Sequence, residues 1–283
     1  MKILVTGKNG QLGSELQDLE PMFPQFRMVF VDRDEMDLNN EEQIKEVLER
    51  EQPGLIINAG AYTAVDKAET EEELCDAINH KAVKTMGEWC SKHGARIVHI
   101  STDYVFDGQS EVPLKETDET DPINVYGKTK RKGEEALEAS GADFIIIRTA
   151  WVYSVYGANF VKTMLRLMNE RDELGVVADQ VGSPTYAKDL AGVILDILNA
   201  PVFVPGIYHY SNEGRISWYE FASAIKEIKG YPCRLNAIES SAFPTPARRP
   251  AFSLLNKEKI KNTYHIKVPF WKDSLSEMLR HME

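Results

Sequence analysis

Residues 2–13 read KILVTGKNGQLG, an apolar run that stops at a turn with glycine at every third position. The run Lys2–Thr6 is rich in β-branched residues and leucine, which is typical of a strand buried on both faces. Helical composition follows in Ser14–Leu19. We therefore expect the chain to open with a strand, a tight glycine turn and a helix.

The same alternation of strand and helix patterns continues to about residue 150. The predicted strands are Met28–Val31, Leu55–Asn58, Arg96–Ser101 and Phe144–Thr149, and the predicted helices are Glu41–Glu51, about Glu71–His93 and about Val125–Ala139. Such alternation indicates βαβ units, so we expect an α/β fold with a Rossmann-type doubly wound parallel sheet. Right-handed crossovers place the carboxyl ends of the strands along one edge, where ligands bind.

Beyond Thr149 the pattern loosens and predicts a smaller α/β substrate-binding domain. We expect helices at Asn159–Asn169, Tyr186–Leu198, Trp218–Lys229 and near Trp271–His281, and strands at Gly175–Ala178, Gly206–Tyr210 and Arg234–Ile238. Ser217, with Glu220 three residues later, predicts a capping box at the start of one helix. We assign residues 1–150 and about 174–199 to the dinucleotide-binding domain, and about 151–173 and 200–283 to the second domain.

Composition narrows the class of protein. The 283 residues carry a formal net charge of -11, with acids and bases mixed along the chain. This argues against a nucleic-acid surface, which needs a basic patch. We find neither a signal-peptide pattern nor an uncharged run long enough to cross a bilayer. The cysteines Cys75, Cys90 and Cys233 lack CxxC spacing, so we expect no disulfide framework, no structural zinc and a cytoplasmic protein.

The glycine turn has the spacing of a phosphate-binding loop. Between a strand and a helix, Gly7, Gly10 and Gly13 would allow a tight turn, close approach of backbone to a pyrophosphate and helix–strand contact. Backbone N–H groups at the helix start would face the anion. After the second strand, Asp32 could accept a hydrogen bond from an adenosine ribose, or Arg33 could pair with a 2′-phosphate. Both residues are present, so the choice between NADH and NADPH stays open.

The segment YGKTK at residues 126–130 carries the predicted chemistry. Tyr126 and Lys130 are four residues apart, so on a helix they share a face. A nearby cation lowers the pKa of a tyrosine and makes it a better proton exchanger. A hydroxyl at the end of the fourth strand would bind the same carbonyl oxygen; Thr102 is placed for this, with Ser101 as its rival. Together with the glycine loop, these residues predict a nicotinamide-dependent carbonyl reductase.

Several motifs resemble those of a known family. The chain resembles the extended short-chain dehydrogenase/reductases, with GxxGxxG, YxxxK and an upstream Ser/Thr, and within them the dTDP-4-dehydrorhamnose reductase family. The motifs that carry this resemblance are residues 7–13 (GKNGQLG), 58–69 (NAGAYTAVDKAE), 101–106 (STDYVF), 126–130 (YGKTK), 148–151 (RTAW) and 244–250 (PTPARRP). They extend over nearly the whole chain.

The resemblance implies an activity and a set of site residues. The activity would be NADPH- or NADH-dependent reduction of the C4 ketone of dTDP-4-dehydro-L-rhamnose to dTDP-L-rhamnose. The catalytic residues would be Tyr126, Lys130 and Thr102. The cofactor would lie against Gly7, Gly10, Gln11, Leu12, Gly13, Asp32, Arg33, Asp37, Leu38, Ala61, Tyr62, Thr63, Tyr126 and Lys130. The dTDP-sugar would contact Thr102, Asp103, Trp151, Arg248 and Arg249.

Two further expectations concern assembly and rival functions. Some members of the family form homodimers through a metal held by acidic residues; Glu15 is present here, but Lys188 stands where a second acid would help, so we assign no metal site. One rival is a reductase or epimerase of another nucleotide sugar. The other is a non-catalytic partner like the regulatory subunit of methionine adenosyltransferase. The intact Thr102, Tyr126 and Lys130 favour an enzyme.

Overall fold

The large sheet is built from short apolar runs that are buried on both faces. In the computed structural model, which describes residues 1–282, Ile3 and Val5 of the first strand pack into one hydrophobic core and Leu4 into the other. The strands pair in parallel in the order β10-β5-β4-β3-β1-β2. Their bounds are β1 (Lys2–Thr6), β2 (Arg27–Val31), β3 (Leu55–Asn58), β4 (Arg96–Thr102), β5 (Asp143–Thr149) and β10 (Gly206–His209). The predicted doubly wound parallel sheet is confirmed.

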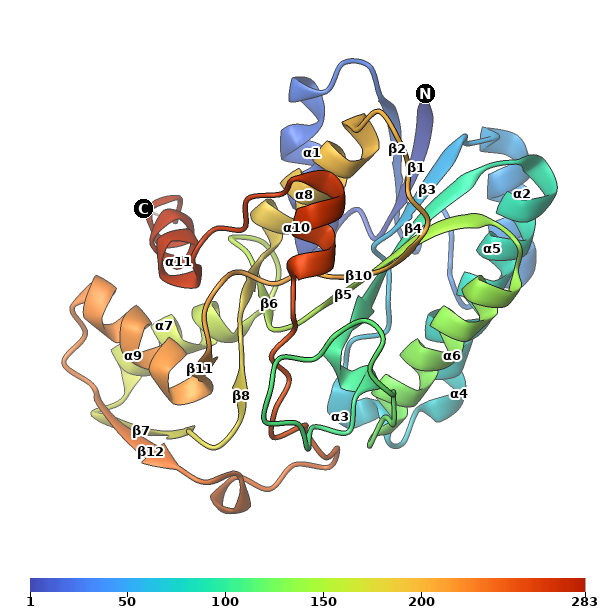
Figure 1. Cartoon of the computed structure of the whole chain (residues 1–283). Coiled ribbons are helices and arrows are strands. Elements are labelled where there is room, and N and C mark those ends of the chain that lie inside the picture. Colours follow the sequence, from blue (N-terminus) through green and yellow to red (C-terminus); the bar gives the residue numbers. More distant parts are fainter. Residues whose placement is uncertain (283) are drawn as a thin grey trace.

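Helices cover both faces of this sheet (Figure 1). One layer contains α1 (Gln11–Leu19), α8 (Ala187–Asn199) and α10 (Glu258–Tyr264), and the other contains α2 (Glu41–Glu51), α5 (Ala82–His93) and α6 (Val125–Ala139). Short helices α3 (Val65–Ala68) and α4 (Glu72–Asp76) precede α5. Asn40 and Asn124 cap α2 and α6 through their side chains, which satisfies amide groups that a helix start leaves free.

The strand order reverses next to β1. The chain leaves β1 for β2 on one side, whereas β3 pairs with β1 on the other side. The turns after β1 and β3 therefore separate and leave a crevice at the carboxyl edge of the sheet, which is where ligands bind in such folds. Both the glycine turn and the segment that follows Asn58 lie at this edge.

A smaller unit lies beside the carboxyl edge (Figure 1). Its strands form three two-stranded sheets: β7 (Glu173–Val177) with β12 (Arg234–Ile238), β8 (Val181–Gly182) with β11 (Ile216–Ser217), and β6 (Val152–Tyr153) with β9 (Thr185–Tyr186). The helices α7 (Phe160–Glu170), α9 (Trp218–Lys229) and α11 (Trp271–Arg280) enclose a third core with them. Ser217 and Glu220 form the predicted capping box at α9. Single 3₁₀ turns occur at Glu20–Met22, Asp103–Val105 and Ser240–Ala242.

Sheet membership differs from the predicted domain division in two places. Residues 200–283 were expected to form the second domain, yet β10 pairs with β5 in the large sheet and α10 packs over it. Conversely, β7 begins at Glu173, close to the predicted boundary at 174, but pairs with β12 in the small unit. Both placements depend on partners more than 50 residues away, which local composition cannot reveal.

The predicted helix Glu71–His93 is interrupted in its middle. Between α4 and α5, the segment Ala77–Lys81 has π-helical hydrogen bonding. Asn79 in this segment accepts a hydrogen bond from the N–H of Tyr62 at 2.9 Å and donates to the carbonyl of the same residue at 3.1 Å. The wider turn thus ties the helix to the loop that follows β3.

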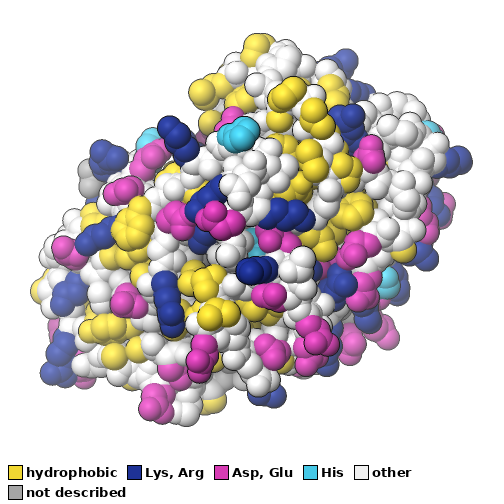
Figure 2. Space-filling view, viewed as in Figure 1, with side chains coloured by type: hydrophobic (Ala, Val, Ile, Leu, Met, Phe, Trp, Pro, Cys, Tyr) yellow, Lys and Arg dark blue, Asp and Glu magenta, His cyan; other side chains and the backbone are white. Residues whose placement is uncertain are grey.

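The surface is mixed in charge. Figure 2 shows acidic and basic side chains interspersed over the viewed face. Over residues 1–282, we find no helix that combines the length and the apolar character required to cross a bilayer.

Candidate active site

The glycine turn brings the start of α1 against β1 and β3. Gly7 has φ +73°, and its carbonyl accepts the N–H of Gly10 at 2.9 Å. A Cβ on Gly13 would lie 2.1 Å from the carbonyl oxygen of Gly7, so only glycine fits there. No side chain caps α1, which leaves the N–H groups near Gln11 and Leu12 available to an anion.

Asp32 lies beside this turn. Its carboxylate accepts the N–H of Asn9 at 3.1 Å and the N–H of Arg33 at 2.8 Å. The side chain of Arg33 is 79% exposed and lies 3.6 Å from Asp37, while Lys8 pairs with Glu35. Acidic and basic side chains therefore both border the predicted ribose position.

The other predicted cofactor residues line the same edge of the sheet. Leu38 packs against Gly60, since a Cβ on Gly60 would meet its Cδ1 at 2.8 Å. Ala61 and Tyr62 are half-buried directly after β3, and Thr63 is exposed. The hydroxyl of Tyr62 donates to Glu71 at 2.7 Å. Segments from β1, β2 and β3 thus converge on one strip of the edge.

Thr102 and Tyr126 meet at the end of β4. Thr102 is buried; its hydroxyl donates to Asp103 at 3.0 Å and accepts the N–H of Tyr104 at 3.2 Å. Burial raises the pKa of Tyr126, and a hydrogen bond with Thr102 opposes this shift. The rings of Tyr126 and Tyr104 pack edge to face with centroids 5.6 Å apart. The two hydroxyls predicted to bind one carbonyl oxygen are therefore neighbours.

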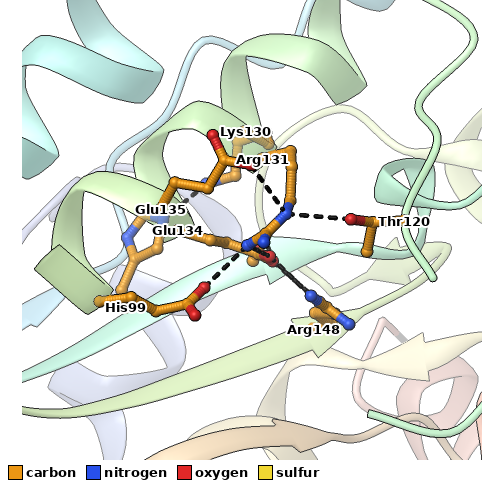
Figure 3. Close-up of polar contacts among 9 residues, drawn as sticks. His99, Thr120, Lys130, Arg131, Glu134, Glu135 and Arg148 are labelled. Carbon is orange, nitrogen blue, oxygen red and sulfur yellow. Dashed lines mark hydrogen bonds and ion pairs between the residues drawn. The ribbon is translucent and has the colours of Figure 1, made fainter. Parts of the chain in front are cut away.

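Ser101, the rival to Thr102, is occupied elsewhere. Its hydroxyl donates to Glu134 at 2.5 Å, and Glu134 also receives Arg148 through two hydrogen bonds of 2.9 and 2.7 Å. Figure 3 shows this carboxylate between Arg148 and Arg131. Ser101 therefore hydrogen-bonds to the buried ion pair of Glu134 and Arg148, on the side of the sheet that α6 covers. Thr102 remains as the hydroxyl at the carboxyl edge.

Lys130 is buried beneath Tyr126 on α6. Its amine donates to the carbonyl of Ile100 at 2.6 Å and lies 3.2 Å from His99 Nε2. Burial lowers the pKa of Lys130 to about 8, against opposing influences from Glu134 and Cys75. Lys128, two residues earlier, is exposed, as its spacing predicts. Lys130 can therefore change protonation state near neutral pH.

Asp103 and Trp151 face the side of the site near the smaller unit. Burial raises the pKa of Asp103 to about 6, while hydrogen bonds from Ser253 and Thr102 lower it. Trp151 has φ 50° and stacks on Trp218, with ring centroids 3.7 Å apart. One face of the indole of Trp151 is thus already covered by a second indole.

The two arginines of the late turn differ. Arg249 forms a two-pronged ion pair with Asp66, at 2.9 and 2.8 Å, whereas Arg248 is exposed. The carbonyl of Arg248 accepts a hydrogen bond from Asn124, the N-cap of α6, at 2.8 Å. This turn is therefore fastened beside the helix that carries Tyr126 and Lys130.

Comparison with known proteins gives the family. The family model described as "RmlD substrate binding domain" matches residues 1–283. The protein belongs to this family. It is 42% identical to the dTDP-4-dehydrorhamnose reductase of Escherichia coli K12 over 296 residues, covering 100% of this chain and 98% of that one.

Solved structures agree with this membership. A dTDP-4-dehydrorhamnose reductase from Clostridium acetobutylicum has a TM-score of 0.95 at 38% identity, covering 100% of this chain and 99% of that chain. The Bacillus anthracis dTDP-4-dehydrorhamnose reductase, solved in complex with NADP, has a TM-score of 0.94 at 36% identity, covering 99% of each chain. The RmlD-family fold therefore extends over the full length.

Glu15 and Lys188, the two positions considered for a metal site, both contact other side chains. Lys188 lies 2.7 Å from Glu277 of α11. Glu15 is buried and accepts a hydrogen bond from Ser154 at 2.6 Å; burial raises its pKa. Both acids thus have protein partners in this RmlD-family chain.

Sequence reasoning missed three polar residues behind the site. Thr6, Asn58 and His99 are each at most 1% exposed and are linked by hydrogen bonds that lead to Lys130. The available signal was a histidine in the centre of an apolar strand, together with a polar residue at the ends of two neighbouring strands.

Proposed function

We propose that this protein is an NAD(P)H-dependent reductase that converts dTDP-4-dehydro-L-rhamnose to dTDP-L-rhamnose. The observation that carries the proposal is the full-length likeness, at 42% identity, to a relative with that activity in its name. The juxtaposition of Thr102, Tyr126 and Lys130 supplies chemistry of the required kind.

The glycine turn fits a dinucleotide. A Cβ at Gly7 would lie 2.9 Å from the backbone of Gly60, and one at Gly13 would fill the space next to Gly7. The open N-terminus of α1 would then hold the pyrophosphate through backbone N–H groups near Gln11 and Leu12. Asp32 would accept a hydrogen bond from the ribose hydroxyl. Arg33 and Lys8 would be the cations nearest a 2′-phosphate. When bound, the reduced nicotinamide would supply the hydride.

The side chains at the end of β4 would handle the proton. The hydroxyl of Thr102 would turn from Asp103, to which it donates in the free protein, and donate instead to the substrate's C4 carbonyl oxygen, which it would polarise. Tyr126 would give its proton to the same oxygen as negative charge develops there. Lys130, charged below a pKa of about 8, would stabilise the resulting tyrosinate. Burial of these groups strengthens each interaction by excluding water.

The substrate would lie between the large sheet and the smaller unit. Asp103 would accept a hydrogen bond from a sugar hydroxyl, and the part-exposed indole of Trp151 would pack against the sugar or the base. Arg248, which is exposed, would reach the diphosphate first. Arg249 would contribute only if it gives up part of its pairing with Asp66.

A direct assay tests this function. Purified protein is mixed with the 4-keto sugar nucleotide and either NADPH or NADH, and oxidation of the cofactor is followed by absorbance. The sugar product is then identified by NMR. We expect stoichiometric formation of dTDP-L-rhamnose. Failure of both cofactors to react with this substrate would overturn the assignment, and turnover of a different nucleotide sugar would redirect it.

Replacement of Gly13 tests the cofactor position. We expect Gly13→Ala to weaken NADPH binding by roughly tenfold or more, the loss that about 1.4 kcal/mol produces, because the new Cβ displaces the turn. Gly192→Ala on α8 is the matched control, since a Cβ there meets nothing within 4 Å. Binding is measured by titration calorimetry. Equal affinity of both variants and the parent would place the dinucleotide elsewhere.

A further inference from the structure

A row of buried polar side chains crosses three adjacent strands behind the catalytic residues. Thr6 of β1 pairs with Asn58 of β3, and Asn58 pairs with His99 of β4, in strand register. Each residue lies two positions after a side chain that packs toward α5 and α6, so all three face that layer. The row ends at Lys130, whose amine lies 3.2 Å from His99 Nε2.

The hydrogen bonds along this row have one direction. The N–H of Gly60, beside the glycine turn, donates to Thr6 Oγ1 at 2.9 Å. The Thr6 hydroxyl donates to Asn58 Oδ1 at 2.7 Å, which turns the amide nitrogen of Asn58 toward His99 Nδ1 at 2.9 Å. Nδ1 is then an acceptor, so a neutral imidazole carries its proton on Nε2, the nitrogen that faces Lys130.

If the hydrogen bonds from Thr6 to Lys130 ran in the opposite direction, a buried N–H or O–H group in the row would have no acceptor. An ammonium has only donors, so a charged Lys130 needs His99 Nε2 as an acceptor and a proton on Nδ1. That proton would face the amide nitrogen of Asn58 unless the amide turned over. With the amide turned, the Thr6 hydroxyl would lose the acceptor it has among the described residues. A buried polar group without a partner is costly.

We propose that His99 is a positioning residue that, through this row, holds the amine of Lys130 by an Nε2–H hydrogen bond and favours its neutral form. The role of Lys130 in turnover rests on the proposed reductase function; the hydrogen-bonded row does not. The ammonium of Lys130 that stabilises the tyrosinate could then also return a proton to it, and this transfer is easiest when the pKa of Lys130 lies near the working pH, which the row favours.

The charged surroundings of Lys130 support this direction. Glu134 on α6 and Cys75 on α4 both favour the ammonium, yet burial outweighs them. Glu134 is itself neutralised by Arg148. Burial and the nearness of Lys130 hold the pKa of His99 well below its usual value, so the imidazole stays neutral. Tyr126 lies one turn earlier on the same helix.

Cofactor-free protein gives a direct test by NMR. The side-chain carbon next to the Lys130 amine is titrated in selectively labelled protein and assigned with Lys130→Met. In His99→Gln the side-chain carbonyl can accept from the ammonium, so the measured pKa of Lys130 should rise by about one unit, the size of shift that one changed hydrogen bond produces. The imidazole ¹⁵N shifts of the parent should show the proton on Nε2.

His209→Gln is the matched control. His209 is also fully buried, but it lies on β10, and its Nδ1 contacts the carbonyl of Leu114 at 3.0 Å. The variant His209→Gln should leave the pKa of Lys130 unchanged. A second pair tests the row from its far end: Thr6→Val should raise the pKa of Lys130, whereas Thr6→Ser keeps the hydroxyl and should not.

The outcomes separate the two proposals. An unchanged or lowered pKa of Lys130 in both His99→Gln and Thr6→Val, or a parent imidazole protonated on Nδ1, would overturn the positioning role. In the enzyme assay, the alkaline limb of the profile of kcat against pH should shift to higher pH in His99→Gln, by the same amount as the pKa of Lys130. A parent that oxidises neither cofactor would defeat the reductase proposal while leaving the NMR result to decide the row.

Discussion

Tyr126→Phe is expected to lower kcat by about 10² to 10⁴, the usual contribution of a general acid. The substitution removes the hydroxyl that hydrogen-bonds with Thr102 at the end of β4 and leaves the aromatic packing on Tyr104 in place. The developing alkoxide would then have no proton donor at that position. Steady-state rates with saturating 4-keto sugar nucleotide and NADPH provide the measurement.

Two controls make this result specific. Tyr208→Phe removes a buried tyrosine hydroxyl on β10, where it donates to the carbonyl of Val204 at 2.9 Å, and should leave kcat near that of the parent. The affinity of Tyr126→Phe for NADPH should change by far less than kcat. If Tyr126→Phe turned over as fast as the parent, another group would have to deliver the proton.

Glu134→Gln is expected to destabilise the fold by about 3–5 kcal/mol, the cost of breaking a buried ion pair by removing one charge. Glu134 is fully buried and receives hydrogen bonds from Arg148, Ser101 and Arg131. The amide would leave the guanidinium of Arg148 buried beneath Phe106 without the carboxylate that it pairs with. Calorimetry should show Tm falling by about 10 °C for a chain of this size.

The comparison with a surface pair isolates the effect of burial. Arg166 and Glu170 form an exposed pair at 2.9 Å on α7, so Glu170→Gln should barely move Tm. The double variant Glu134→Leu/Arg148→Met should be more stable than Glu134→Gln, since an apolar pair leaves no buried charge unpaired. A Tm for Glu134→Gln equal to that of the parent would mean that the guanidinium finds another partner.

The framework of the fold could be predicted because its signals are local. Buried parallel strands appear as continuous apolar runs, and the caps of α2, α6 and α9 are single side chains next to their helices. The position of β10 could not be predicted in this way. Its four residues enter the large sheet through pairing with β5, which lies about 60 residues earlier in the chain.

The same distinction between local signals and long-range contacts applies to the site residues. The relation of Tyr126 to Lys130 follows from helix spacing. The sequence favours Thr102 over its rival Ser101, and the contact of Ser101 with Glu134 supplies a structural reason for that preference. The pairing of Arg249 with Asp66 joins segments 183 residues apart. His99 was overlooked because its importance depends on strand register and not on any short motif.

The π-helical segment Ala77–Lys81 has a consequence for how the chain tolerates changes in length. One turn there holds an extra residue, and Asn79 in this turn hydrogen-bonds to the backbone of Tyr62. Deleting one residue would restore regular α-helical winding and remove the widened turn that carries Asn79. Asn79 would leave Tyr62, and the loop after β3 would lose its clamp. Insertions and deletions compatible with a working cofactor edge must therefore fall outside these five residues.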